Sequence, residues 1–237
     1  MTRANTSTGP REAPSGSGEG ATAERILDAA VVAFGSRGYE AVSLDALAEG
    51  LGIRKQSILY WFPSKEAILQ AVIDRCAAEL AGALEASLST AGDGWARVEA
   101  VVRSVFRLAA RRPALLGLVR EASRLGPPAA TRLVMALDPL VERAASFLGA
   151  EMDAGRMRRH EPRLLLLAIY STVVGMITEV EVLRALGEEP TARSLVRRRQ
   201  EILRLLRSAL LVEAPASRGA EAQELAGGRG RVGLGGV

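Results

Sequence analysis

Apolar residues recur three and four positions apart along most of this chain, which is the spacing of one face of an α-helix. Glycine, proline and short polar runs interrupt the period. They predict helices at residues 22–37, 43–51, 55–62, 64–86, 95–111, 113–124, 129–154, 162–186 and 191–212. Because alanine, leucine, arginine and glutamate are abundant and β-branched runs are scarce, the fold class that we predict is all-α.

Two features modify this outline. Asp138-Pro139 lies inside the segment 129–154 and predicts a kink or a fresh helix start with Asp138 as N-cap. Residues 1–21 are rich in Ser, Thr, Gly and Pro, and residues 214–237 in Gly, Ala and Arg, so both are expected to be disordered tails. Thr22 is expected to cap the first helix.

The stretch 43–69 has the strongest local signals. Ser43 is a good N-cap, because its hydroxyl can accept from a free backbone N–H. Gly52 stands where a helix end favours a left-handed residue. Pro63 stops the next helix, and Ser64 caps the long one that follows. Two short helices joined by a glycine turn predict a helix-turn-helix, with a third helix before it.

Within this motif the second helix has two distinct faces. Ile58, Trp61 and Phe62 are expected to face the core. The side that remains is polar and comprises Lys55, Gln56, Ser57 and Tyr60, with Arg54 at the helix entrance. By charge alone, an ordinary solvated helix face explains this side equally well, because residues 22–70 carry five basic and six acidic side chains.

The run from Ile26 to Leu69, above all GIRKQSILYWFPSKEAIL, resembles the DNA-binding domain of tetracycline-repressor-type (TetR-family) regulators. The matching positions are Phe34, Gly38, Tyr39, Ser43, Ala48, Gly52 and Phe62-Pro63-Ser64-Lys65-Glu66. The family usually has Tyr where Leu59 stands, and that Tyr commonly contacts a DNA phosphate. Either the contact is missing here or Tyr60, one residue on, replaces it. The resemblance covers about a fifth of the chain; the remainder is similar in length and helical character.

The resemblance implies double-stranded DNA as a partner. Gln56 suits adenine, and Arg54 or Lys55 suits guanine or phosphate. Ser43 and Lys65 are placed for phosphates, which position the domain without reading sequence. The predicted DNA-binding residues are Ser43, Arg54, Lys55, Gln56, Ser57, Tyr60 and Lys65.

Residues 71–213 contain more apolar helix than a DNA-binding domain requires, and in the resembling family this region forms a homodimer and holds a small-molecule pocket. Segment 162–186 is apolar around most of its circumference, so one side can face a partner; a helix pair buried within a monomer is the alternative. The predicted interface residues are Ser171, Gly175, Leu195, Ile202 and Leu206. The candidates for lining a pocket, each of which can equally be plain core, are Phe106, Met135, Phe147, Tyr170 and Met176.

Composition restricts the remaining classes. The 237 residues contain one cysteine, Cys76, and one histidine, His160, which excludes an intramolecular disulfide framework and leaves no His-rich metal site or His-Cys constellation. We therefore expect no enzyme, no metal and no cofactor, and a reduced, cytoplasmic setting. The longest apolar run, 164–177, is shorter than the ~18–20 residues of a membrane span.

The sequence therefore predicts an N-terminal three-helix helix-turn-helix domain, residues 22–70, and a larger C-terminal helical domain, residues 71–213, for ligand binding and dimerisation. The predicted protein is a DNA-binding transcriptional regulator, a repressor on a pseudo-palindromic operator, which a small apolar or amphipathic ligand releases. The alternative is a helical protein-interaction module that does not bind DNA.

Overall fold

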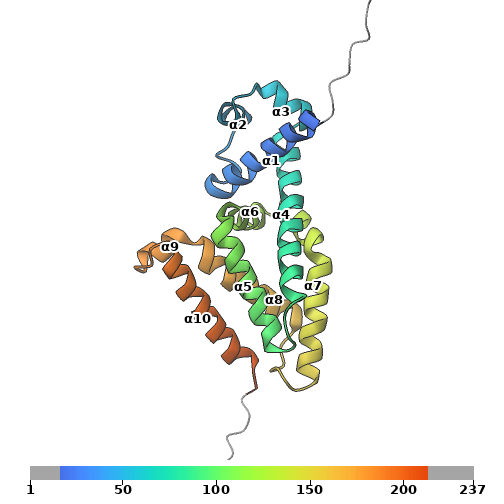
Figure 1. Cartoon of the computed structure of the whole chain (residues 1–237), viewed down its shortest axis with the longest axis vertical. Helices are drawn as coiled ribbons and strands as arrows, with labels where there is room; N and C mark the ends of the chain where they lie inside the picture. The colour runs from blue at the N-terminus through green and yellow to red at the C-terminus, as the bar shows by residue number, and fades with distance from the viewer. Residues whose placement is uncertain (1–16, 213–237) are drawn as a thin grey trace, which may run out of the picture.

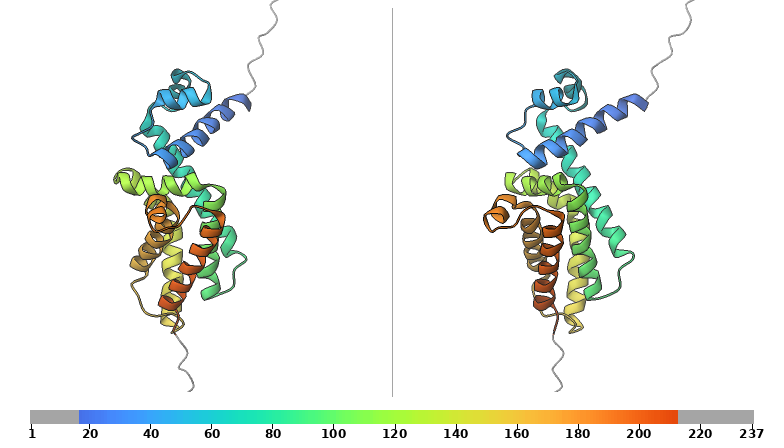
Figure 2. Two further views of the ribbon diagram at one scale, coloured as in Figure 1. Left: turned by 90° about the vertical axis from the view of Figure 1, so that its left-hand side faces the viewer. Right: turned by 60° about the vertical axis from the view of Figure 1, so that its left-hand side comes forward.

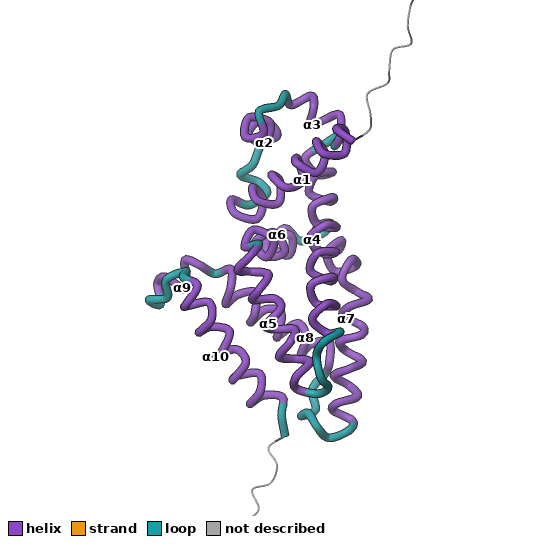
Figure 3. Tube along the Cα trace, in the orientation of Figure 1, coloured by secondary structure: helices purple, strands orange, loops and turns teal. Residues whose placement is uncertain are grey.

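The computed structural model describes residues 17–212, and the regular secondary structure of this part of the chain is all α-helix, joined by loops, apart from one isolated β-bridge, Met157 to Leu211 (Figures 1 and 3). This confirms the all-α prediction. The helices are α1 (Ser17–Arg37), α2 (Leu44–Leu51), α3 (Lys55–Trp61), α4 (Lys65–Leu88), α5 (Trp95–Arg111), α6 (Pro113–Leu125), α7 (Ala129–Asp153), α8 (Pro162–Thr178), α9 (Val180–Ala185) and α10 (Ala192–Leu210).

Helices α1, α2 and α3 form one end of the molecule, and α5 to α10 form the other (Figures 1 and 2). Helix α4 runs from the first group into the second. Buried side chains follow it: a single cluster extends from Ile26 on α1 through Ile58 and Ile68 to Leu133 on α7. A continuous core therefore joins the small end to the larger body.

The local signals around the helix-turn-helix are confirmed. The Ser43 hydroxyl accepts from the Ala46 N–H at 3.0 Å and caps α2. Gly52 has φ 66°, in the left-handed region, and its N–H donates back to the Ala48 and Glu49 carbonyls. The Ser64 hydroxyl accepts from the Ala67 N–H at 3.1 Å and caps α4. These bonds fix the direction in which α3 leaves α2.

Two predicted N-caps, Thr22 and Asp138, are wrong, and residues 17–21 of the expected N-terminal tail are helical. Helix α1 begins at Ser17, so Thr22 lies inside it; threonine is tolerated within a helix, and its position alone does not define the start. The other residues of the expected tails, 1–16 and 214–237, lie outside the described residues. Helix α7 continues through Pro139, so Asp138 is not an N-cap. Helix α7 packs along α4, and tertiary packing of this kind offsets the lost backbone bond.

The segment predicted as one helix at 162–186 is divided into α8 and α9. Glu179, between them, has φ −80° and ψ 57° and ends α8. Two distant side chains stabilise the break. The buried Arg198 guanidinium donates to the Met176 carbonyl, and the Arg120 guanidinium lies 2.7 Å from the Glu179 carboxylate. Helix α10 starts at a capping box in which the Thr191 and Ser194 side chains and N–H groups bond reciprocally.

Helices α1 and α6 cross in direct backbone contact. A Cβ atom built on Gly35 would lie 2.0 Å from the Ala114 carbonyl oxygen, and one built on Gly117 would lie 2.1 Å from the Gly35 carbonyl oxygen. Only glycine at both positions permits this approach. The crossing fixes α1 against the larger body.

Candidate nucleic-acid interface

The two faces of α3 are those that the sequence predicts. Ile58 is completely buried, and Trp61 and Phe62 are partly buried against the core. On the other side Gln56 is exposed, and Tyr60 is 76% exposed. Arg54, also exposed, is the residue that precedes the helix, and Ser57 is half-buried. A short helix thus presents a polar, aromatic face to solvent.

Two lysines flank this face, and each has a partner within the chain. The Lys55 ammonium lies 2.9 Å from the Asp45 carboxylate on α2. The Lys65 ammonium lies 4.1 Å from the centroid of the Tyr39 ring. Lys55 is thus held against α2 at the start of α3, and Lys65 against the turn between α1 and α2 at the start of α4.

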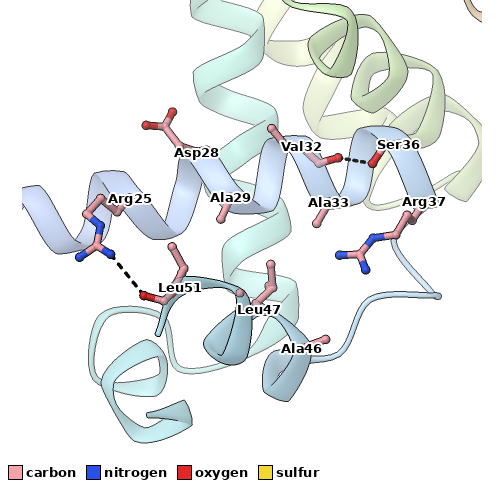
Figure 4. A pocket seen from close by; sticks show the side chains of 11 residues that line it. Arg25, Asp28, Ala29, Val32, Ala33, Ser36, Arg37, Ala46, Leu47 and Leu51 are labelled. Carbon is pink, nitrogen blue, oxygen red and sulfur yellow. Dashed lines mark hydrogen bonds between the residues drawn. The ribbon is translucent and has the colours of Figure 1, made fainter. Parts of the chain in front are cut away.

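A shallow hollow of about 660 Å³ lies between α1 and α2, and the sequence did not predict it (Figure 4). Its floor includes Ala29, Val32 and Leu47, and the Arg25 guanidinium donates to the Leu51 carbonyl at 3.3 Å across one end. Val32 is 59% exposed there, although its neighbours on α1 are core residues. The hollow opens on the side of the small end and contains none of the predicted DNA-binding residues.

The residues predicted to line a ligand pocket do not share one site. Phe106 and Met176 belong to the cluster between α5, α8 and α10; Phe147 packs on a separate cluster near Met152. Tyr170 packs on the main core, and its hydroxyl lies 2.8 Å from that of Ser123. Met135 is 70% exposed on α7, so in this chain it lies at the surface and not in a cavity wall. The period of α7 alone did not indicate which side is covered.

Two of the predicted dimer residues are misplaced. Ile202 and Leu206 are 2% and 6% exposed in the chain's own core, because α10 turns this stripe towards α5 and α8. They have no surface left for a partner. Ser171 is exposed, and Gly175 and Leu195 are half-buried. The large exposed apolar side chains on α8 are instead Leu164 and Leu167.

Two buried carboxylates that the sequence did not single out each accept two hydrogen bonds from one arginine guanidinium, an arrangement called here an arginine fork. Glu121 is 8% exposed and Glu151 is 5% exposed. Hydrogen bonds from Arg124 lower the pKa of Glu121 below its ordinary value of 4.5, and burial opposes this. Hydrogen bonds from Arg156 lower the pKa of Glu151 in the same way. Each fork joins residues that are close in sequence, but an isolated glutamate on a helix gives no sign of it.

We expect acid to destabilise the fold through these two groups. Their folded pKa values are lower than the unfolded value, so their contribution is complete above pH ~4.5 and is lost as the pH falls below it. Urea unfolding at pH 7 and at several values from pH ~4.5 down to about pH 2 measures this loss. Glu151→Gln should lower the midpoint at pH 7 and make it less sensitive to acid. A variant as acid-sensitive as the parent would contradict the assignment.

Within the described residues there is no group of three or more His, Cys, Asp or Glu side chains able to hold a metal ion. None of the described helices is long and apolar enough to cross a membrane. The Cys76 thiol is buried, and burial raises its pKa to about 12, so it is not a reactive thiolate.

A capped α2, a glycine turn and an exposed α3 packed on α1 and α2 define a helix-turn-helix protein. Residues 26–72 match the family of bacterial regulatory proteins called the tetR family. IcaR of Staphylococcus aureus, a negative transcriptional regulator of the biofilm operon icaADBC, is 34% identical over 53 residues, or 22% of this chain and 28% of IcaR. The chain thus spans under a third of the length of these relatives.

Solved structures extend the likeness to most of the chain. A TetR transcriptional regulator from Chloroflexus aurantiacus has a TM-score of 0.65 at 20% identity, over 82% of this chain and 98% of that one. A protein from Saccharomonospora viridis, solved in complex with choline, has a TM-score of 0.65 at 21% identity, over 81% and 99%. These structures establish the shared fold. The sequence likeness to the tetR family is confined to the N-terminal domain, residues 26–72.

Proposed function

We propose that the protein is a sequence-specific transcriptional repressor that binds a pseudo-palindromic operator as a homodimer. The observation that carries this proposal is the face of α3, on which Gln56 and Tyr60 are exposed while Ile58 anchors the opposite side. A helix presented in this way fits the major groove, where each base pair has its own donor and acceptor pattern. In this proposal residues 22–70 read DNA, and residues 71–213 bind the ligand and the second subunit.

In this proposal, residues around α3 make the contacts to DNA phosphates. The Lys55–Asp45 pair is an exposed ion pair, of a kind that contributes only about 0–1 kcal/mol, so a phosphate can replace Asp45. Lys65 and the exposed Ser43 lie at the starts of α4 and α2, where helix dipoles favour an anion. The exposure of Tyr60 supports our proposal that it makes the phosphate contact that Leu59 cannot make.

The face of α8 supports dimerisation. Leu164, Leu167, Ser171 and Gly175 recur three and four residues apart, and the two leucines are 65% and 57% exposed. An apolar stripe of this length is stabilised when it packs on another helix. A second copy of α8, related by a two-fold axis, offers the same stripe. Leu195 on α10, half-buried, lies among the candidates for the edge of this interface.

Ligand control is the remaining element of the proposal. The family relationship supports it, and the S. viridis protein of similar fold is in complex with choline. A small apolar or amphipathic molecule would release the operator if it bound better to a dimer whose two α3 helices are wrongly spaced. The repressor assignment follows the negative regulator IcaR.

Gln56 and Lys65 are expected to have different roles, and two substitutions separate them. Gln56→Ala should cost about 1–3 kcal/mol per half-site and relax preference at one base position, because an exposed Gln on α3 can pair with adenine. Lys65→Ala should weaken binding to all sequences alike and flatten the salt dependence, because a phosphate contact reads no base. Fluorescence anisotropy with a selected operator and its single-base variants, at several salt concentrations, measures both.

Identical effects of the two substitutions on every operator variant would remove this division of labour. Wild-type protein without salt-sensitive affinity for any duplex would overturn the proposed function itself, and a protein-interaction module would then be favoured.

A further inference from the structure

Glu121 reaches out of α6 and binds the turn that leads into the helix-turn-helix. Its Oε1 accepts from the buried Tyr39 N–H at 2.8 Å, a contact between residues 82 positions apart in sequence. The same carboxylate lies beneath Gly38, whose φ is 83°, and a Cβ atom there would be 3.3 Å from Oε1. The carboxylate therefore holds the short turn between α1 and α2.

Arg124 fixes that carboxylate from the other side. Its Nε donates to Oε2 and its Nη2 donates to Oε1, both at 2.8 Å. The two donors of the guanidinium leave the carboxylate little freedom to rotate. A charged acceptor with a fixed orientation gives the Tyr39 N–H a stronger and more directional bond than a neutral one.

Tyr39 connects this turn to the helices around it. Its ring packs edge-on against Phe34 of α1, with 5.3 Å between ring centroids. Its hydroxyl donates to Glu66 Oε1 in the first turn of α4 at 3.0 Å. Its carbonyl accepts from the Val42 N–H just before α2, at 3.2 Å. A turn bound in this way passes its position on to α2 and hence to α3.

The bonds from Arg124 to Glu121 and from the Tyr39 N–H to Glu121, together called the Glu121 clamp, lie close to the glycine crossing of α1 and α6. Glu121 follows Gly117 by four residues and so lies about one helical turn along α6, and Tyr39 lies two residues beyond the end of α1, four residues after Gly35. The backbone contact at Gly35 and Gly117 fixes the point where the helices meet. Buried side chains of both helices pack around this point, and the Glu121–Tyr39 bond adds a directional contact at the end of α1.

We propose that Glu121, held by Arg124, is a positioning residue that fixes the angle between the helix-turn-helix and the larger helical body. The inference rests on the proposed function: in a dimer, this angle sets the separation of the two α3 helices and therefore the half-site spacing that the protein accepts. Loss of the Glu121 clamp leaves α3 and its DNA contacts intact. The orientation of the helix-turn-helix relative to the larger body then varies. The dimer then loses affinity for the optimal operator and tolerates wrong spacings better.

A series of operators that differ only in the spacer between half-sites tests this. For the wild type, adding or removing one base pair should weaken binding by about ten- to a hundredfold, since avidity requires that both half-sites be engaged together. For Glu121→Ala the optimal operator should bind more weakly. The spacing ratio, which is the affinity for the optimal operator divided by the affinity for an operator with an altered spacer, should approach unity. Glu121→Gln keeps an oxygen that can accept from the Tyr39 N–H and should restore most of the ratio.

Glu151→Ala is the matched control. Glu151 is as buried as Glu121 and accepts similar paired bonds, of 2.8 and 2.7 Å, from Arg156. It belongs to the last turn of α7. It should lose comparable stability and keep the spacing ratio of the wild type. If Glu121→Ala does not fold, Arg124→Ala, whose side chain is 59% exposed, should shift the ratio in the same direction.

Amide hydrogen exchange of the full chain without DNA gives a second readout. Exchange at Tyr39 should accelerate in Glu121→Ala and stay at the wild-type rate in Glu151→Ala. A wild-type spacing ratio or an unchanged Tyr39 rate in folded Glu121→Ala would overturn the inference and leave the proposed function standing. A wild type that binds no duplex would instead overturn the proposed function.

Discussion

Gly117→Ala should destabilise the protein by about 3 kcal/mol or more, at the upper end of the range for overpacking. The new Cβ atom would lie 2.1 Å from the Gly35 carbonyl oxygen, and a backbone atom cannot move aside as a flexible side chain does. Helix α6 would have to separate from α1 and expose the core beneath. For a chain of this size the expected fall in Tm is about 6–12 °C, measured by thermal unfolding.

Gly82→Ala on α4 provides the comparison, because a Cβ atom there meets nothing within 4 Å. Alanine is the better helix former, so this variant should be stabilised by about 0.5–1 kcal/mol. If Gly117→Ala behaved like Gly82→Ala, the two helices would not be in backbone contact.

Gly175→Leu should separate the proposed dimer and lower affinity for the proposed operator by about 10²- to 10⁴-fold, the gain that a second linked binding site provides. Within its own chain, a Cβ atom at Gly175 meets nothing within 4 Å, so the subunit should stay folded. On the exposed stripe of α8 the leucine would keep two helices apart. Sedimentation gives the oligomeric state, circular dichroism the fold, and gel shift at fixed salt the affinity.

Gly82→Leu, also on a helix with open space around it, should remain dimeric and bind the operator as the wild type does. A Gly175→Leu protein that stays dimeric would move the interface away from this part of α8.

The parts of the fold that the sequence predicts are those with local causes. Ser43, Gly52 and Ser64 bond to groups within five positions of themselves, so their types and places were sufficient. The faces of α3 follow from helical period in the same way. The break between α8 and α9 depends on Arg198 and Arg120, which come from other helices, and no local pattern indicates it.

The same reasoning explains the errors in the candidate sites. Ile202 and Leu206 have the period of an amphipathic stripe, but period does not say whether a stripe faces its own core or a partner. Met135 is apolar, but only one side of α7 is covered and Met135 lies on the other. Glu121 was missed because its contact with Tyr39 joins residues 82 positions apart, and a single glutamate on a helix normally indicates a solvated face.

The measurement that tests the central claim most directly is selection of bound sequences from random duplex DNA by the purified full-length protein. We expect enrichment of an inverted repeat whose half-site centres lie about 34–36 Å apart, or a multiple of this, because two-fold-related α3 helices enter the same side of the duplex. The preferred bases should change at one position per half-site with Gln56→Ala. A pool that shows no sequence enrichment, or a single asymmetric site that Gln56→Ala leaves unchanged, would contradict the account.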